Sequence, residues 1–352
     1  MPRTEASAYT GPRLIQAPMV GATDPSFVIS ACQAGLLGSL GGGASPPLRL
    51  QQEIRAIRSG TDDLFNINLF VIDERIGQTP PPEELAALDA WYAQLGLSPD
   101  LPASYAPSFE AQFQVLLDEA PPITSFTFGL LAPEQAQGLQ QRGCQVIGTA
   151  TSPDEALAWQ SVGADFICLQ GLEAGGHRGP FLSDAPGQPL ADLFATCREL
   201  IARPLIVAGG LMDGRAAADY LIAGAAAAQL GSAFLCCPEA PTVPAHRQAL
   251  LEAREAAEQQ TVLIRSFSGR QARGLPNAYT RHFETQPVSP YPIRNALTQP
   301  LRRWAAQHGD RENLSLWVGQ GHRAIRERPL DELAAELHDE LQQALSAAGS
   351  QA

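Results

Sequence analysis

The sequence predicts an α/β fold: a closed (β/α)8 barrel (TIM barrel) with an added, mostly helical second domain. Short apolar runs alternate with helix-like segments over about the first 235 residues, a rhythm typical of a parallel sheet. There are eight such runs, the number of strands in this barrel. An open doubly wound sheet is the alternative, but no Gly-x-Gly-x-x-Gly follows the first run.

The apolar runs are not strictly alternating, as expected of parallel strands that are buried on both faces. The predicted strands are residues 14–19, 36–40, 64–70, 123–128, 145–150, 165–170, 204–208 and 226–230. Helix starts lie between them. Ser152 and Pro153 combine a cap residue with a proline at the first helical position. Asp213 precedes a helix over 216–223, and Ser108 and Pro133 mark two further starts.

Two regions interrupt this rhythm and set the expected domain organisation. Residues 1–236 form the barrel, with a long excursion over 71–106 that is expected to be a lid. Residues 237–319 form a helical cap that borders the substrate, with helices over 245–260 and 300–309 around an irregular stretch, 267–292. Residues 320–352 return to the barrel through one amphipathic helix, 330–345.

Composition excludes several classes of protein. The formal net charge of -13 argues against nucleic acid or an anionic membrane as a partner. No apolar run is long enough for a transmembrane helix, and residues 1–11 lack the apolar core of a signal peptide. The 6 cysteines form no Cys-x-x-Cys, so neither a metal site nor a disulfide framework is expected, and the cytoplasm is the expected location. The oligomeric state, monomer or homodimer, is left open.

Glycines follow the last two predicted strands, where a TIM barrel usually binds phosphate. Gly209 and Gly210 follow the seventh strand, and Gly231 and Ser232 follow the eighth. Backbone N–H groups and a helix start can hold a dianion there without lysine. The alternative is that these small residues only allow close helix packing.

The sixth strand ends at Gln170 and leads to Gly175, Gly176 and His177. Glycine lets the backbone approach a ligand closely, and a histidine there is expected to titrate near neutral pH. The alternative is a flexible loop with an incidental surface histidine. The amides of Gln170 and Asn68 can each donate and accept, which suits the edge of a flavin-like ring. The alternative is that Asn68 is a core residue whose hydrogen bonds are satisfied within the protein, and that Gln170 is an ordinary loop residue.

These motifs resemble the nitronate monooxygenase family, formerly called 2-nitropropane dioxygenases, and its class I members in particular. The resemblance extends from about residue 14 to 322. It is carried by Ala17-Pro18-Met19, Phe65-Asn66-Ile67-Asn68, Ser125-Phe126-Thr127-Phe128-Gly129, residues 170–179, 208–210 and 229–240, Tyr291-Pro292, Asn295, Leu297-Thr298 and residues 314–321.

The resemblance implies non-covalent FMN at the mouth of the barrel. The phosphate would lie on the glycines after the last two strands, and the ring near Gln170, Asn68 and Gly175. The implied cofactor-binding residues are Pro18, Met19, Val20, Asn68, Ser125, Gln170, Gly175, Gly176, Gly209, Gly210, Gln229, Leu230, Gly231 and Ser232. Because the chain contains no lysine, backbone donors or the hydroxyls of Ser125 or Thr127 would replace a lysine contact to the flavin.

The resemblance also implies the reaction. Alkyl nitronates such as propionate 3-nitronate would be oxidised by O2, through a flavin semiquinone, to a carbonyl compound and nitrite, a detoxification. His177 would be the catalytic residue, acting electrostatically or as a general base. Tyr291, Asn295 and Gln320 would border the substrate pocket. Arg294 either favours a nitronate with a carboxylate or pairs with an acid on the surface.

Three other functions remain open at this point. An NAD(P)H-dependent quinone or enoyl reductase can use the same barrel, although no separate dinucleotide motif is present. A flavin-binding protein without turnover is a second alternative. A cofactor-free phosphosugar lyase or isomerase is the third, and the absence of lysine leaves it no Schiff-base residue.

Overall fold

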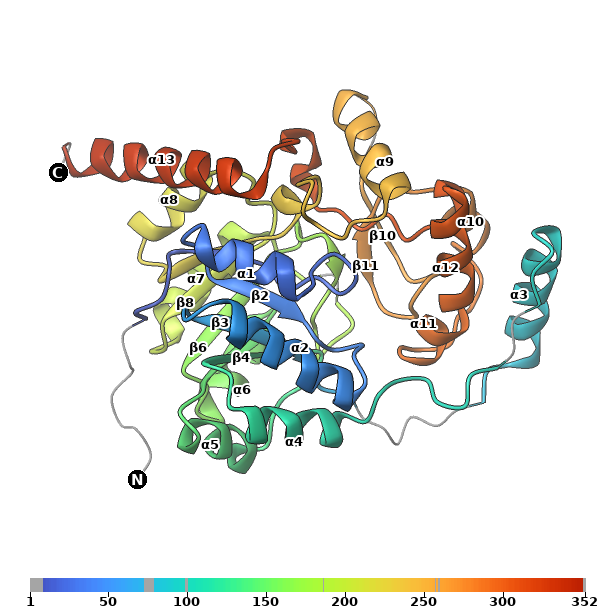
Figure 1. Cartoon of the computed structure of the whole chain (residues 1–352), viewed down its shortest axis with the longest axis horizontal. Helices are drawn as coiled ribbons and strands as arrows, with labels where there is room; N and C mark the ends of the chain where they lie inside the picture. The colour runs from blue at the N-terminus through green and yellow to red at the C-terminus, as the bar shows by residue number, and fades with distance from the viewer. Residues whose placement is uncertain are drawn as a thin grey trace.

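Eight parallel strands form a barrel in the computed structural model, which describes residues 9–72, 79–98, 101–185, 187–256, 258 and 260–350 (Figure 1). The strands are β1 (Leu14–Gln16), β2 (Gly38–Gly41), β3 (Phe65–Phe70), β4 (Ile123–Thr127), β5 (Gln145–Ala150), β6 (Phe166–Gln170), β8 (Leu205–Ala208) and β9 (Ala227–Leu230). Their order is β1-β9-β8-β6-β5-β4-β3-β2. The N–H of Gln16 donates to the carbonyl of Leu37 over 3.0 Å and so joins β1 to the start of β2. All eight predicted strands are confirmed.

Helices follow most of the strands and cover the outside of the barrel (Figure 1). They are α1 (Pro25–Gln33), α2 (Pro47–Gly60), α4 (Phe109–Glu119), α5 (Pro133–Gln141), α6 (Pro153–Ser161), α7 (Leu190–Leu200) and α8 (Gly214–Ile222). Ser108, Ser152 and Asp213 each accept a backbone N–H at a helix start, as their positions predict. The terminal helix α13 (Leu330–Gly349) packs on α8, where a Cβ on Gly214 would lie 2.1 Å from the carbonyl oxygen of Leu337. The tail helix α13 thus lies against a helix on the outside of the barrel.

The barrel interior is a packed core. Ile15, Ile147, Phe166 and Ile206 from four different strands belong to one buried cluster. The ring of Tyr9 packs edge-on against Phe166, with 5.2 Å between the ring centres. The interior therefore leaves chemistry to the ends of the strands, as in other TIM barrels.

The chain after β9 contains short helices, irregular stretches and strands, and the sequence did not predict the strands. Its elements are η1 (Ser232–Phe234), α9 (Pro244–Glu255), β10 (Val262–Ile264), β11 (Ala272–Gly274), α10 (Ala278–His282), α11 (Ile293–Leu297), α12 (Gln299–His308), η2 (Arg311–Asn313) and η3 (Gln320–Ala324). The predicted helix over 300–309 is confirmed and ends at Gly309, whose φ is +67°. The predicted helix over 245–260 ends early, because Ala256 takes extended backbone. Residues 257 and 259 lie outside the described part.

The excursion after β3 packs on this later segment. Its helix α3 (Pro82–Gln94) contributes Leu88 and Tyr92 to a second hydrophobic cluster, with Phe267, Tyr279 and Leu301 from the chain beyond the barrel. Figure 1 shows α3 beside α10, α11 and α12. The hydroxyl of Tyr92 donates to the carbonyl of Leu297 over 2.7 Å. Residues 73–78 and 99–100 of the excursion are outside the described residues.

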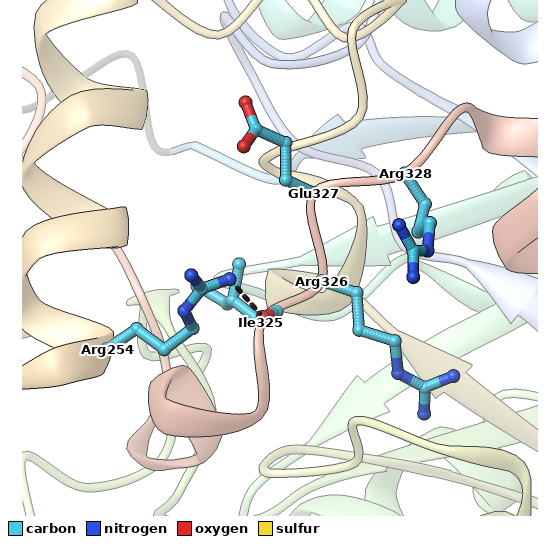
Figure 2. A pocket seen from close by; sticks show the side chains of 5 residues that line it. All are labelled: Arg254, Ile325, Arg326, Glu327 and Arg328. Carbon is cyan, nitrogen blue, oxygen red and sulfur yellow. Dashed lines mark hydrogen bonds between the residues drawn. The ribbon is translucent and has the colours of Figure 1, made fainter.

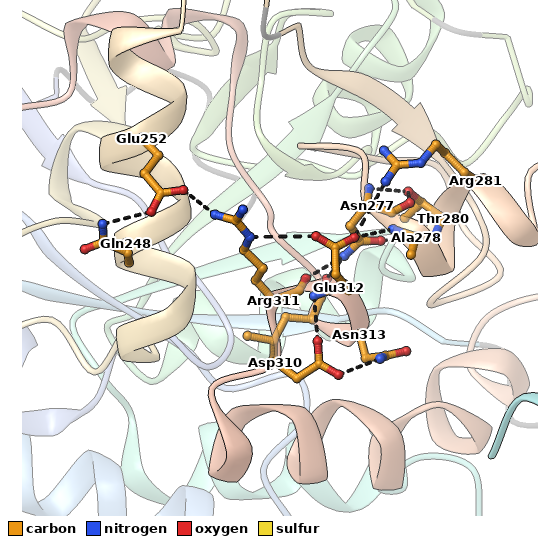
Figure 3. A network of polar contacts seen from close by, with 11 residues as sticks. Gln248, Glu252, Asn277, Ala278, Thr280, Arg281, Asp310, Arg311, Glu312 and Asn313 are labelled. Carbon is orange, nitrogen blue, oxygen red and sulfur yellow. Dashed lines mark hydrogen bonds and ion pairs between the residues drawn. The ribbon is translucent and has the colours of Figure 1, made fainter. Parts of the chain in front are cut away.

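A polar network joins α9, α10 and η2 (Figure 3). The side-chain amide of Asn277 donates to the carbonyls of Arg311 and Leu314 over 2.9 and 2.7 Å. The carboxylate of Glu312 accepts the N–H of Ala278 over 2.7 Å, and Arg311 pairs with Glu252. These contacts hold the segment that follows η2 against β11, where the N–H of Leu275 donates to the carbonyl of Leu316. No described helix is long and apolar enough to cross a membrane.

Candidate active site

His177 lies on a short strand and not in a loop. Strand β7 (Gly176–His177) pairs antiparallel with β11, and Ala272 is opposite His177. The side-chain amide of Gln170 donates to the carbonyl of His177 over 3.0 Å and accepts the N–H of Gly179 over 2.9 Å. The alternative of a flexible loop with an incidental surface histidine is therefore wrong, because the chain beyond the barrel pairs with this segment and fixes it.

Aromatic rings surround His177. The centres of the rings of Phe70, Phe128, Tyr291 and Trp317 lie 6.4, 5.6, 5.8 and 5.7 Å from the centre of the imidazole. Phe128 has a φ of +80°, a left-handed conformation that is costly for this residue and that often occurs at functional sites. Nε2 of His177 is buried and has no hydrogen-bond partner among the described residues. A buried polar atom of this kind points to a ligand.

The surroundings of His177 lower its pKa to about 3. Burial is the main cause, and the positive charges of Arg270 and Arg302 add to it. The expected pKa near neutrality is wrong, because the sequence shows neither the aromatic walls nor the two cations. The imidazole is neutral at physiological pH.

The glycines after β8 and β9 meet at the same end of the barrel. Ala208 of β8 lies between Gln170 and Gln229 in the sheet register. Gly209 and Gly210 have φ values of +117° and +72°. Four backbone N–H groups there have no acceptor within the described chain. They are those of Gly209, Gly210, Gly231 and Ser232.

The C-terminal segment also reaches these glycines, a contact that the sequence did not predict. The N–H of Gly319 donates to Oγ of Ser232 over 2.9 Å. A Cβ on Gly175 would lie 2.4 Å from the nitrogen of Gly319, so only glycine allows this approach. The motif at 314–321 was visible in the sequence, but its contact with Ser232 and Gly175 depends on the tertiary structure.

The other predicted cofactor-binding residues also lie at or just beyond strand ends. Asn68 is opposite Ser125 in the sheet, and its amide donates to Oγ of Ser125 over 3.0 Å and to Oγ1 of Thr127 over 3.3 Å. Pro18 and Met19 are half-buried beyond β1, and Val20 is exposed. A Cβ on Gly41 would lie 2.6 Å from the nitrogen of Val20, so β2 and the end of β1 are close. Leu230 is buried and pairs with Gln16 in the ladder.

The three predicted substrate residues occupy different surroundings. Tyr291 packs against His177, as described above. The side-chain oxygen of Asn295 accepts a hydrogen bond from Nη2 of Arg302 over 2.9 Å. Gln320 is exposed, and its backbone N–H donates to the carbonyl of Glu173 over 3.0 Å. The geometry thus brings Tyr291 to the histidine, while contact of Asn295 and Gln320 with substrate stays a prediction.

A family model described as nitronate monooxygenase matches residues 3–340. The chain belongs to the nitronate monooxygenase family. A nitronate monooxygenase of Pseudomonas aeruginosa PAO1 is 38% identical over 341 residues, which are 93% of this chain and 95% of the relative. The chain is accordingly an enzyme, an oxidoreductase of this family.

Solved structures agree with the nitronate monooxygenase assignment. A nitroalkane oxidase from Streptomyces ansochromogenes is 37% identical and superposes with a TM-score of 0.85, over 97% of this chain and 98% of the other. FabK from Thermotoga maritima is 24% identical and superposes with a TM-score of 0.73, over 97% and 96% of the two chains. The second likeness concerns the fold alone.

Arg294 has neither of its expected roles in this member of the nitronate monooxygenase family. It is fully buried and pairs with the buried Glu84 of α3, with 3.1 Å between Nη1 and Oε1. It also donates to the carbonyl of Ser266 over 2.7 Å and to the hydroxyl of Tyr279 over 2.8 Å. It therefore joins α3 to α11, and the cations near His177 are instead Arg270 and Arg302. No motif in the sequence marked either of these two arginines.

A cavity of about 300 Å³ lies elsewhere, just before α13 (Figure 2). It is lined by Arg254, Ile325, Arg326, Glu327 and Arg328. Its guanidinium groups are paired: Arg326 with Glu336 and Glu340, both at 3.0 Å, Arg328 with Glu336 at 3.4 Å and Arg254 with Glu255 at 2.8 Å. These charges are therefore already compensated by carboxylates of the same chain.

Proposed function

We propose that this enzyme uses non-covalent FMN to oxidise alkyl nitronates, including propionate 3-nitronate, with O2 to a carbonyl compound and nitrite. The observation that carries the proposal is the set of four free N–H groups after β8 and β9, at the same end of the barrel as His177. Family membership supports the nitronate substrate. The nitroalkane oxidase likeness supports a substrate with a nitro group.

The residues present fit FMN. Free N–H groups at glycine turns and at the start of η1 suit a phosphate dianion in a chain without lysine. An added Cβ on Gly176 would meet no atom within 4 Å, and one on Gly231 none closer than 3.4 Å, so the backbone is open there. Gly209, Gly210, Gly231 and Ser232 would hold the phosphate, and Asn68, Ser125, Gln170 and Gly175 would border the ring. Bound flavin would supply the electron transfer between nitronate and O2.

The protein's own groups prepare the substrate. The aromatic rings around His177 exclude water, which strengthens electrostatic interactions in the site. The neutral imidazole can donate one hydrogen bond to a nitronate oxygen and so position it. Its lowered pKa makes it a weak base, so we assign it an electrostatic and positioning role toward preformed nitronates.

We further propose that residues 237–319 act as a second domain over this site, together with α3. The pairing of β11 with β7 and the contact of Tyr291 and Trp317 with His177 support this arrangement. Substrate would then enter between this segment and the barrel, where the aromatic walls meet.

The purified holoprotein tests the proposal. Flavin released from it is identified by mass, and O2 uptake and nitrite release are followed with propionate 3-nitronate. NADH is added anaerobically in parallel. We expect FMN, turnover of the nitronate and no bleaching by NADH. Bleaching by NADH without nitronate turnover would indicate a reductase, and flavin without either reaction would indicate a binding protein. Failure to bind FMN on reconstitution would overturn the phosphate assignment.

A further inference from the structure

We propose that Arg270 is a positioning residue: its guanidinium clamps the ring of Phe128 and thereby closes the enclosure around His177. This role rests on the proposed function, which makes His177 the group that meets the substrate. Three features carry it, namely the backbone of Phe128, the side chains stacked on its ring and the carbonyls that hold the guanidinium.

Phe128 is held in a conformation that is costly for it. It directly follows β4, and its φ of +80° is left-handed backbone, which is rare for a bulky residue. Such backbone persists only where the surrounding structure fixes it. The centre of the Phe128 ring lies 5.6 Å from that of His177 and 5.3 Å from that of Tyr291. Phe128 is therefore a wall of the enclosure, and other groups must hold this wall in place.

Two groups cover the Phe128 ring. The ring of Phe70 stacks on it, with 4.3 Å between the ring centres and 25° between the planes. The guanidinium carbon of Arg270 lies 4.1 Å from the centre of the same ring, a cation–π contact. Two groups so close to one ring centre cannot share a face, so the ring is sandwiched between them. Phe70 is itself confined, since a Cβ on Gly43 would lie 2.5 Å from its Cδ2.

The same guanidinium holds the segment that carries His177. Nε of Arg270 donates to the carbonyl of Arg178 over 3.2 Å, and Nη2 donates to the carbonyl of Pro180. The N–H of Arg178 in turn donates to the carbonyl of Gln271 over 2.8 Å. One side chain thus connects the residue after His177 with the aromatic ring beside the imidazole.

Arg270 lies in the turn between β10 and β11, and the turn presents it in a fixed way. Gly269 has a φ of +77°, and a Cβ there would lie 2.1 Å from the carbonyl oxygen of Ser289, so only glycine fits. The hydroxyl of Ser268 donates to the carbonyl of Arg270 over 3.1 Å. A tight turn of the chain beyond the barrel therefore brings this guanidinium to a ring of the barrel.

No carboxylate among the described residues forms an ion pair with Arg270. Glu155 accepts hydrogen bonds from backbone N–H groups of three other residues. Asp184 lies 3.8 Å from the guanidinium of Arg265 instead. Neutral carbonyls and an aromatic face hold Arg270, which suits a clamp and not a surface ion pair.

Access to the imidazole of His177 reports whether the clamp is closed. Nε2 of His177 is buried and unpartnered within the described chain, so a reagent reaches it only when the enclosure opens. Diethyl pyrocarbonate acylates neutral imidazoles, and peptide mass gives the rate at each histidine of the purified protein. His308 is exposed and sets the reference rate, while the buried His322 reports general loosening.

Four variants are compared with the wild type. Arg270→Met removes the charge and both hydrogen bonds but keeps an apolar chain of similar length. Arg270→Lys keeps a charge for the ring without the planar fork. Phe128→Ala removes the clamped ring. Arg265→Met is the matched control, since Arg265 lies on the same turn with its side chain 42% exposed.

We expect Arg270→Met to raise the rate at His177 at least about tenfold relative to His308, with His322 unchanged. Arg270→Lys should give an intermediate rate, and Arg265→Met the wild-type rate. Wild-type protection of His177 in Arg270→Met would overturn the clamp. An equal rise at His322 would indicate general loosening and would overturn it too.

A double variant tests whether Arg270 acts through Phe128. In the Phe128→Ala background, Arg270→Met should raise the rate at His177 by less than about twofold, because the ring that it holds is gone. Independent effects of the two changes would contradict the stacked arrangement.

Turnover separates this role from the proposed function. With propyl-1-nitronate, flavin-replete Arg270→Met should show a kcat about tenfold lower and a KM changed by less than about threefold, because the histidine is misplaced while the aromatic surface remains. An unchanged kcat would remove Arg270 from the reaction. If the wild type oxidises no nitronate, the proposed function fails, and the acylation rates still decide whether Arg270 closes the enclosure.

Discussion

Gln170 holds His177 by its backbone: Nε2 of the amide lies 3.0 Å from the carbonyl oxygen of His177. The oxygen of the same amide accepts the N–H of Gly179. One side chain at the end of β6 thus clamps both sides of the histidine segment. The orientation of the imidazole depends on this clamp and on the pairing of β7 with β11.

Replacing Gln170 by Glu should misplace His177. The carboxylate keeps an acceptor for Gly179 but faces the carbonyl oxygen of His177 without a donor, which costs about 1–3 kcal/mol. We expect kcat/KM for the nitronate to fall at least about tenfold, with a matching loss in the free energy of unfolding. Gln140→Ala is the control: this glutamine bonds Gly163 and Asp165 at the opposite end of β6. It should lower stability and leave kcat/KM unchanged.

Removing the imidazole should abolish most of the activity while FMN stays bound. His177→Gln is expected to lower kcat/KM about 100-fold, the usual loss when one positioned hydrogen-bond donor to a reacting group is displaced. Flavin content and nitrite release are measured together. His308→Gln changes an exposed histidine of α12 and should have no effect. Full activity in a flavin-replete His177→Gln enzyme would remove the histidine from the mechanism.

Neutral nitroalkanes should be poor substrates. Burial, Arg270 and Arg302 lower the pKa of His177 to about 3, so at pH 7 the imidazole is neutral but a weak base. Without an effective base, 3-nitropropionate should show a kcat/KM at least about 100-fold below that of its nitronate. Initial rates from freshly dissolved, still protonated nitro compound give this ratio. Comparable values for the two forms would mean that a stronger base acts in the site.

His246 should make the protein less stable in mild acid. Its Nε2 lies 3.1 Å from the carbonyl oxygen of Trp317, and burial lowers its pKa from 6.5 to about 4. As the pH falls below 6.5, the unfolded chain takes up a proton that the folded chain resists until about pH 4. The free energy of unfolding therefore falls over this interval, by about 2–3 kcal/mol for one such group. Urea unfolding between pH 7 and 4 should show a shallower dependence for His246→Gln and an unchanged one for His308→Gln.

The buried pair of Glu84 and Arg294 should be essential for the contact between α3 and α11. Removing one partner leaves a buried charge, so Glu84→Gln and Arg294→Met should each cost about 3–5 kcal/mol. The double variant should cost less than the two singles together, because neither charge remains. Arg49→Ala, which breaks the exposed pair with Glu53, should cost less than about 1 kcal/mol. Chemical unfolding of the holoprotein measures all four.

The eight strands and the main helix starts could be predicted from the sequence alone. Apolar runs such as 145–150 and caps such as Ser152 act over a few residues, so their signal is local. The same holds for the glycines after β8 and β9, because parallel strands bring their carboxyl ends to one edge. His177 was identified by its position after such a strand.

Only the tertiary structure decided the surroundings of that histidine. Its pairing with Ala272 joins residues that lie 95 positions apart, and no local pattern marks such a contact. Arg294 and Arg302 share one short stretch of sequence, yet Arg294 is buried against Glu84 and Arg302 donates to Asn295. The pKa of His177, and hence its charge at a given pH, follows from these long-range placements, because electrostatic interactions depend on distance in space and on burial and not on separation along the chain.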